Sequence, residues 1–275
     1  MAEVSRFLLD WIIPMGFREL MRWREFKQGI KTASKDSDIL SRNKKFHNLY
    51  AGRRCFIIGT GPSISRQDLT LISNEITIVM NHFHEHPILE KWQPTFYCAG
   101  DPLSNYTPEE TKYISKVASK IHPQAYFLHL SLKDMIVKNK MFPIENTYYL
   151  KFLGSPHEWA RLKYNWNLNG AVMDILTTMH MAIIVALYLG CSPIYLIGAD
   201  HDWLSSNTHM KHFYTNMDGN DFKGSYKYAL EYTLELWQIH EALRDAALAR
   251  GVTIYNATDG GFLDVYPRVD YKTLF

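Results

Sequence analysis

A tight glycine turn, Gly59–Ser63, directly follows an apolar run and is the clearest candidate for a ligand-binding segment. The stretch from Cys55 reads CFIIGTGPS, which predicts a buried strand that ends in this turn. At the C-terminal end of a strand in an open α/β sheet, small residues let a phosphate approach the backbone. The turn lacks the Lys-Ser/Thr pair of a P-loop and the third glycine of the dinucleotide fingerprint. It therefore favours a nucleotide or nucleotide sugar over triphosphate-cradling and dehydrogenase chemistry.

Polar or glycine residues also follow the other predicted strands. Asn81, Asp101, the Gly198-Ala199-Asp200 segment and the NATDGG segment from Asn256 each come directly after an apolar run. Because the carboxyl ends of parallel strands lie at one edge of a sheet, these residues are expected to line one crevice. The sequence therefore predicts a ligand site at that edge.

The segment HFHEH, His82–His86, has alternating histidines that could suggest a metal site. Strand-like spacing followed by Pro87 is more typical of a polar loop, so no metal ion is predicted.

Strands and helices alternate along the chain, which predicts an α/β, Rossmann-like, doubly wound and mostly parallel sheet. Two irregular regions, 131–168 and 201–222, are expected to form a helical lid or insertion. Residues 51–275 form the expected nucleotide-sugar-binding catalytic domain, preceded by an N-terminal amphipathic helix and linker, 1–50. The expected strands are 54–58, 76–80, 95–99, 125–130, 192–197 and 252–255, and the expected helices are 65–72, 108–120, 170–189 and 226–250.

Composition restricts the partners and the compartment. The net charge of +2 does not indicate a nucleic-acid partner. Cys55, Cys98 and Cys191 lie in or beside apolar segments without metal-ligand spacing, so buried reduced thiols and a cytoplasmic location are predicted. No apolar run is long enough to cross a membrane, but residues 7–31 combine apolar and basic side chains. They predict either peripheral contact with an inner membrane or packing on the domain or a second subunit.

Four segments in one order give the chain a family resemblance: GTGPSI, MNHF, FYCAGDP and ALYLGCSPIYLIGADHDW. They resemble the bacterial sialyltransferases of glycosyltransferase family 42. They are equally similar to the related group with motility-accessory-factor and 6-hydroxymethylpterin-diphosphokinase-like domains. The resemblance covers about 52–270 and implies a fold that holds a CMP-sugar donor as co-substrate, without a metal ion or other cofactor. The residues implied to bind the donor are Gly59, Thr60, Gly61, Pro62, Ser63, Asn81, Asp101, Asn169, Gly170, Gly198 and Asp200.

The resemblance also implies a histidine base in the segment after the GAD strand, which reads HDWLSSNTHMKHFY. His212 is the first candidate and His209 the second, with His201 also in the segment and Asp202 as an ambiguous carboxylate. A neutral imidazole can take the proton of an acceptor hydroxyl near neutral pH. Tyr214 is the nearest candidate to stabilise the leaving phosphate. The implied activity is an inverting glycosyltransferase that moves a sialic-acid-like sugar to a glycan or lipid-linked acceptor.

Two alternatives remain open from sequence. A pterin pyrophosphokinase would need ATP and magnesium, with Asp101, Asp200 and Asp202 as ligands. A non-catalytic nucleotide- or glycan-binding module would bind without turnover and tolerate changes at all three histidines.

Overall fold

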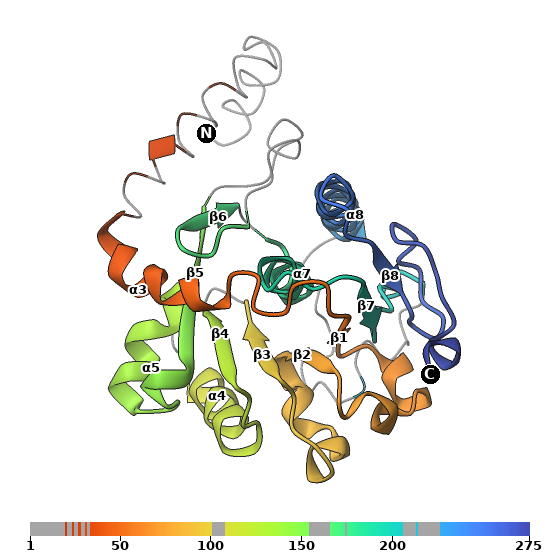
Figure 1. Ribbon diagram of the computed structural model, residues 1–275, viewed down its shortest axis with the longest axis horizontal. Coiled ribbons are helices and arrows are strands. Elements are labelled where there is room, and N and C mark those ends of the chain that lie inside the picture. The colour runs from red at the N-terminus through yellow and green to blue at the C-terminus, as the bar shows by residue number, and fades with distance from the viewer. Residues whose placement is uncertain are drawn as a thin grey trace.

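The centre of the molecule is a parallel β-sheet. The computed structural model describes residues 20, 24, 27–28, 31, 34–100, 108–153, 166–173, 175–205, 213 and 226–275. Within them, eight strands pair in the order β6-β5-β4-β3-β2-β1-β7-β8, every pair parallel (Figure 1). The predicted α/β, Rossmann-like class is confirmed. The strands are β1 Cys55–Ile58, β2 Ile76–Met80, β3 Phe96–Ala99, β4 Ala125–His129, β5 Thr147–Leu153, β6 Ala171–Met173, β7 Ile194–Ile197 and β8 Ile254–Asn256.

Helices cover both faces of the sheet, because strand side chains alternate between two apolar cores. Cys55 and Ile57 of β1 belong to the core under α7 and α8, and Phe56 and Ile58 to the core under α4 and α5. Figure 1 shows these helix pairs on opposite sides of the sheet. All residues of α7 are buried, as expected for a helix between the sheet and α8. The α-helices are α3 Ser37–Ser41, α4 Pro108–Lys120, α5 Lys133–Asn139, α7 Thr178–Tyr188 and α8 Tyr226–Leu248.

The strand order creates a switch point between β1 and β7. From β1 the chain moves outward strand by strand to β6, and α7 then returns it to β7 on the other side of β1. The connections therefore diverge at the carboxyl ends of β1 and β7, where open α/β sheets bind their ligands.

Two strands lie where the sequence predicts other structure. β5 lies in the expected lid-like region 131–168, together with α5, and joins the sheet beside β4. The predicted helix from Gly170 is wrong at its start, because 171–173 form β6 and α7 begins at Thr178. The apolar residues of β6 run almost without a break into those of α7, so periodicity alone does not separate them. Pairing with Lys151–Leu153 of β5 decides for the strand.

The short helices also differ from expectation. The predicted helix 65–72 is instead two 3-10 helices, Pro62–Arg66 and Leu69–Ile72. The other 3-10 helices are Ser34–Asp36, Arg42–Phe46, Asn81–Glu85, Pro87–Glu90, Leu130–Leu132, Ile144–Asn146 and Tyr271–Leu274.

The polar segment 32–50 packs against the domain. Although this segment belongs to the expected linker, Leu40, Asn43 and Phe46 are all buried. The Phe46 ring lies 4.7 Å from that of Tyr148, and Asn43 Nδ2 donates to the carbonyl oxygen of Tyr149 at 2.9 Å. A few apolar contacts and one buried amide thus fix this segment to β5. The predicted N-terminal amphipathic helix, 7–31, lies outside the described residues except at single positions.

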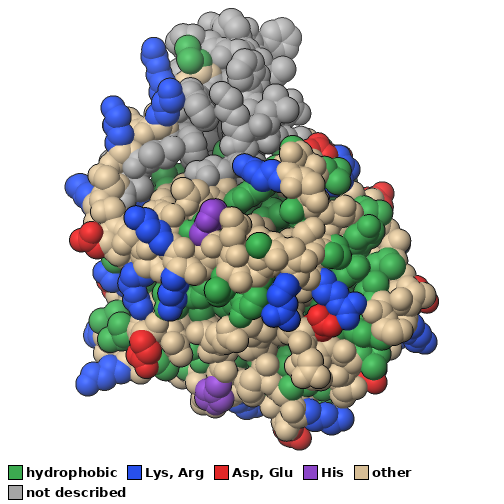
Figure 2. Space-filling model, in the orientation of Figure 1, with side chains coloured by type: hydrophobic (Ala, Val, Ile, Leu, Met, Phe, Trp, Pro, Cys, Tyr) green, Lys and Arg blue, Asp and Glu red, His purple; other side chains and the backbone are tan. Residues whose placement is uncertain are grey.

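The three cysteines are free and buried, which confirms the prediction of reduced core thiols. On the face in Figure 2, Lys and Arg side chains lie singly or in small groups among uncharged ones. In the part of the chain that the structure describes, no helix has the length and apolar character needed to cross a bilayer.

Candidate active site

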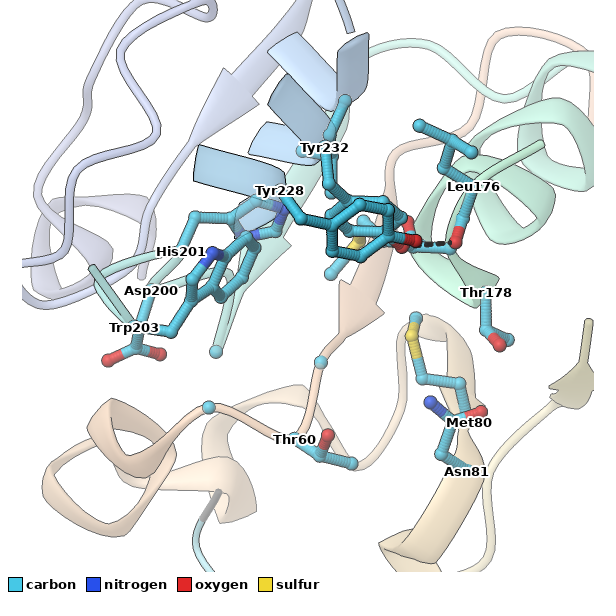
Figure 3. A pocket seen from close by; sticks show the side chains of 16 residues that line it. Thr60, Met80, Asn81, Leu176, Thr178, Asp200, His201, Trp203, Tyr228 and Tyr232 are labelled. Carbon is cyan, nitrogen blue, oxygen red and sulfur yellow. Dashed lines mark hydrogen bonds between the residues drawn. The ribbon is translucent and has the colours of Figure 1, made fainter. Parts of the chain in front are cut away.

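A cavity of about 440 Å³ opens at the switch point of the sheet. Its walls come from the loops after β1, β2 and β7, the start of α7 and the first turns of α8 (Figure 3). The lining residues are Gly59, Thr60, Gly61, Met80, Asn81, Leu176, Thr177, Thr178, Met179, Gly198, Asp200, His201, Trp203, Tyr228, Tyr232 and Leu236.

The glycines of the turn are required by contact between two loops. The Gly59 and Gly61 amides donate to the carbonyl oxygens of Ile197 and Gly198, at 2.8 and 3.0 Å. A Cβ on either glycine would overlap the Gly198 carbonyl oxygen, and one on Gly61 would also overlap the Asp200 carboxylate. Gly198 has a φ of +65°, which favours glycine. The close packing of the two loops therefore explains these glycines without a phosphate.

Asp200 presents a buried, oriented carboxylate at the cavity wall. Its oxygens accept hydrogen bonds from Ser63, at 2.7 Å from the hydroxyl and 3.1 Å from the amide. Burial raises the pKa of Asp200, while the Ser63 hydroxyl opposes that rise. The loop after β8 supports the backbone of Asp200, since its carbonyl oxygen accepts from the Phe262 amide at 2.7 Å. The NATDGG segment therefore lies behind the wall that Asp200 forms.

A histidine cluster stands behind another part of the wall. His201 has a φ of +50°, and its Nε2 lies 3.2 Å from Nε2 of His240. Nδ1 of His240 lies 3.0 Å from the Tyr266 hydroxyl, and the ring of His180 lies 4.3 Å from that of His240. Burial lowers the pKa of His201 to about 4 and that of His180 to about 3. These imidazoles are therefore neutral near pH 7, and Nε2 of His201 is engaged with His240.

Aromatic side chains face the glycine turn across the cavity (Figure 3). Tyr228 and Tyr232 come from α8, and the Tyr232 hydroxyl donates to the Leu176 carbonyl oxygen at 2.8 Å. Trp203 donates from Nε1 to the Thr233 hydroxyl at 3.2 Å. Sequence reasoning missed these residues, although tyrosines four apart at the start of a helix do share one face. Such a wall can stack against a nucleobase or a sugar ring.

The start of α7 supplies the helix N-terminus that the sequence places elsewhere. Thr177 caps the helix through its side chain, and Thr178 and Met179 also line the cavity. First-turn amides have no partner within a helix and favour anions. The predicted position, Asn169 and Gly170, lies before the amino end of β6, which is an outermost strand of the sheet. Asn169 there accepts a hydrogen bond from Tyr188, at the far end of α7. A threonine before the apolar run MHMAIIVALYL was the signal for the true start.

Asn81 has an unusual environment on the cavity floor. Its φ is +48°, and its backbone oxygen accepts from the Tyr97 hydroxyl at 3.0 Å. Its Oδ1 is buried without a hydrogen-bond partner among the described residues. A polar atom in this condition is expected to find a partner in a ligand or in water.

The structure brings together one part of the predicted donor site. The predicted residues that line the cavity are Gly59, Thr60, Gly61, Asn81, Gly198 and Asp200. Pro62 and Asp202 adjoin lining residues in the chain but do not line the cavity themselves. Ser63 does not line it either and contacts the lining residue Asp200 by hydrogen bonds. Asn169 and Gly170 lie away from the cavity. Asp101, His209, His212 and Tyr214 lie outside the described residues. Phe213, which is described, donates from its amide to the Thr60 carbonyl oxygen at 3.0 Å.

One group of side chains in the described part of the chain has the composition of a metal site: His82, His84 and Glu85. It follows β2 and does not line the cavity. Within the described lining residues, Asp200 is the only carboxylate, and no lysine or arginine is present.

No protein-family model matches the chain, and no curated protein matches it in sequence. A MAf glycosyltransferase from Magnetospirillum magneticum AMB-1 is similar in structure, with a TM-score of 0.51 and 15% identity over 88% of this chain and 39% of that chain. This chain thus spans about two fifths of that protein. The structure of the sialyltransferase CST-II with a trisaccharide acceptor and CMP matches with a TM-score of 0.44 and 14% sequence identity, over 79% of this chain and 86% of that chain. The structure of CstII from Campylobacter jejuni with CMP-3FNeuAc matches with a TM-score of 0.43 and 12% identity, over the same fractions of the two chains. The first likeness shows a glycosyltransferase-like α/β fold.

Proposed function

We propose that the protein is an inverting, metal-independent glycosyltransferase that moves a sialic-acid-like sugar from a CMP donor to a glycan or lipid-linked hydroxyl. The observation that carries the proposal is the composition of the switch-point cavity. It joins a glycine turn, a helix N-terminus, an oriented carboxylate and an aromatic wall in one space. These are the groups that a nucleotide sugar needs for its phosphate, ribose and rings.

Neutral donors would hold the phosphate of the CMP leaving group. The described lining residues offer the hydroxyls of Thr60 and Thr178 and the first-turn amides of α7, and they include no lysine or arginine. Such fixed donors stabilise negative charge that develops as the bond to the sugar breaks. Asp200 accepts hydrogen bonds, which suits a ribose hydroxyl.

His212 is the proposed base, with His209 as the second candidate. His201 is unsuited, because its pKa is lowered to about 4 and its Nε2 is engaged with His240. The hydrogen bond from Phe213 to Thr60 favours the neighbours of Phe213 in the chain, His212 and Tyr214. The imidazole takes the proton of the acceptor hydroxyl, whose oxygen bonds to the anomeric carbon as CMP leaves from the opposite face. Tyr214 would donate to the leaving phosphate, and Asp202 remains a candidate to assist the base.

The test is CMP release from CMP-sialic acid in the presence of a galactose-terminated glycan. We expect His212→Ala to lower the rate about 100-fold or more while CMP affinity stays within about twofold. His122→Ala changes an exposed histidine outside the cavity and serves as the matched control. Absence of CMP binding by calorimetry would refute the proposal. Magnesium-dependent ATP binding would instead favour a pyrophosphokinase, and CMP binding without turnover a binding module.

A further inference from the structure

The turn after β2 brings together three side chains of types that can ligate a metal ion. The segment HFHEH is not extended, because Asn81–Glu85 form 3-10 turns with a kink at His82. In that helix, Nδ1 of His82 lies 3.5 Å from Oε1 of Glu85, and Nε2 of His84 lies 3.7 Å from the same oxygen. All three ligand atoms lie within 4.8 Å of one another. The histidine spacing that looks strand-like in sequence therefore converges on one carboxylate.

His84 is buried, and its ring has no hydrogen-bond partner among the described residues. Its side chain is 1% exposed, and neither ring nitrogen has a hydrogen bond among the described residues. A metal ion binds imidazole through a ring nitrogen that carries no proton and binds carboxylate through its oxygens, and these two groups lie side by side here.

Neighbouring aromatic residues fix this arrangement. The ring of His82 stacks on Tyr113 of α4 at 4.3 Å, with an interplanar angle of 25°. The Tyr113 hydroxyl lies 2.9 Å from that of Tyr97, which in turn donates to the Asn81 carbonyl oxygen. The turn is thus braced from α4 and β3, and its ligands are oriented before any ion binds.

We propose that His82, His84 and Glu85 bind a divalent transition-metal ion such as zinc, with solvent completing the coordination. Ligand atoms about 2.1 Å from a tetrahedral zinc ion lie about 3.4 Å apart. Two of the separations, 3.5 and 3.7 Å, are close to this value. Two imidazoles and one carboxylate suit zinc or cobalt rather than magnesium or calcium, which prefer oxygen ligands. The site does not depend on the proposed transferase reaction.

The test uses untagged full-length protein that has been dialysed against chelator. Zinc is titrated by calorimetry, and cobalt by its visible ligand-field absorption. We expect one ion per chain and a tetrahedral or five-coordinate cobalt spectrum. His82→Ala, Glu85→Gln and His84→Ala should each weaken zinc binding more than about tenfold. His122→Ala, at an exposed histidine, should bind zinc like the parent protein.

Two of the three proposed ligands are partly exposed, so they can be replaced without disturbing the core. His82 and Glu85 have side chains 35% and 39% exposed, so their variants are expected to fold even if His84→Ala does not. Zinc should raise the melting temperature of the parent protein but not that of Glu85→Gln. No zinc binding by the parent, or unchanged binding in both the His82→Ala and Glu85→Gln variants, would overturn the proposal.

Discussion

The loops at the switch point and the turn after β2 lie at the same edge of the sheet, but they differ in whether their buried polar atoms have hydrogen-bond partners. In the loops after β1 and β7, backbone amides donate hydrogen bonds to carbonyl oxygens of the other loop. Asp200 accepts a hydrogen bond from Ser63, and His201 pairs with His240. In the turn after β2, Oδ1 of Asn81 and both ring nitrogens of His84 are buried without hydrogen-bond partners among the described residues. The polar groups named in the first region are paired with one another, whereas these three atoms of the second have no such partner among the described residues.

This difference shows which buried polar atoms still lack a partner among the described residues. The motif that looks most like a phosphate cradle is fixed largely by its own packing against Gly198 and Asp200. The less distinctive histidine turn keeps polar atoms that cost free energy until something binds them. Unsatisfied buried groups therefore indicate ligand contacts more directly than glycine content does.

The largest expected effect is at the packed loops. Gly61→Ala should lower the free energy of unfolding by about 3 kcal/mol, because its Cβ overlaps the Gly198 carbonyl and the Asp200 carboxylate. The φ of Gly61 is −63°, so the effect is steric rather than conformational. Urea denaturation measures the change. Gly170→Ala is the matched control, since nothing lies within 4 Å of its added Cβ, and it should change stability by less than about 0.5 kcal/mol. Equal effects would contradict the close packing of the loops.

A smaller effect should appear in the pH dependence of stability. The pKa of His201 is lowered from 6.5 to about 4, so between these values the folded state binds fewer protons than the unfolded state. Stability is therefore lost as the pH falls through this window. His201→Gln removes one such group and should reduce that loss by about 2–3 kcal/mol, since a difference of one pKa unit is worth about 1.4 kcal/mol. Denaturation at a series of pH values tests this, and His122→Gln should leave the pH dependence as in the parent. An unchanged slope in His201→Gln would mean that His201 is not held neutral by burial.

The smallest effect on stability is expected at Asn81. Asn81→Gly keeps a residue that accepts a φ of +48° and removes a buried oxygen that has no hydrogen-bond partner in the part of the chain that the structure describes. The free energy of unfolding should change by less than about 1 kcal/mol. CMP affinity, measured by calorimetry, should fall about tenfold if Oδ1 meets the nucleotide. A large loss of stability with unchanged affinity would assign Asn81 to the scaffold instead.

The sequence was sufficient for the alternating strands and for the edge at which the cavity opens. The runs at β1, β2, β3 and β4 are short, apolar and followed by polar or glycine residues, which are strong local signals. β6 was not predictable in this way, because three apolar residues adjoin an apolar helix and only pairing with β5 distinguishes them. The aromatic wall was also missed, because Tyr228 and Tyr232 come to face the glycine turn across the cavity only when α8 packs beside α7.

The sequence by itself determined the fold class and the sheet edge at which the cavity opens. Local apolar runs and glycine turns depend on neighbours in the chain, so they can be read without coordinates. Only the tertiary structure decided which polar groups are satisfied by the protein itself. Ser63 donates a hydrogen bond to Asp200, which lies 137 residues away in the chain. His240 pairs with His201, 39 residues away. His84 has no such long-range partner among the described residues. Whether a buried polar group has a hydrogen-bond partner depends on residues that only folding brings together. A local sequence pattern therefore cannot predict it.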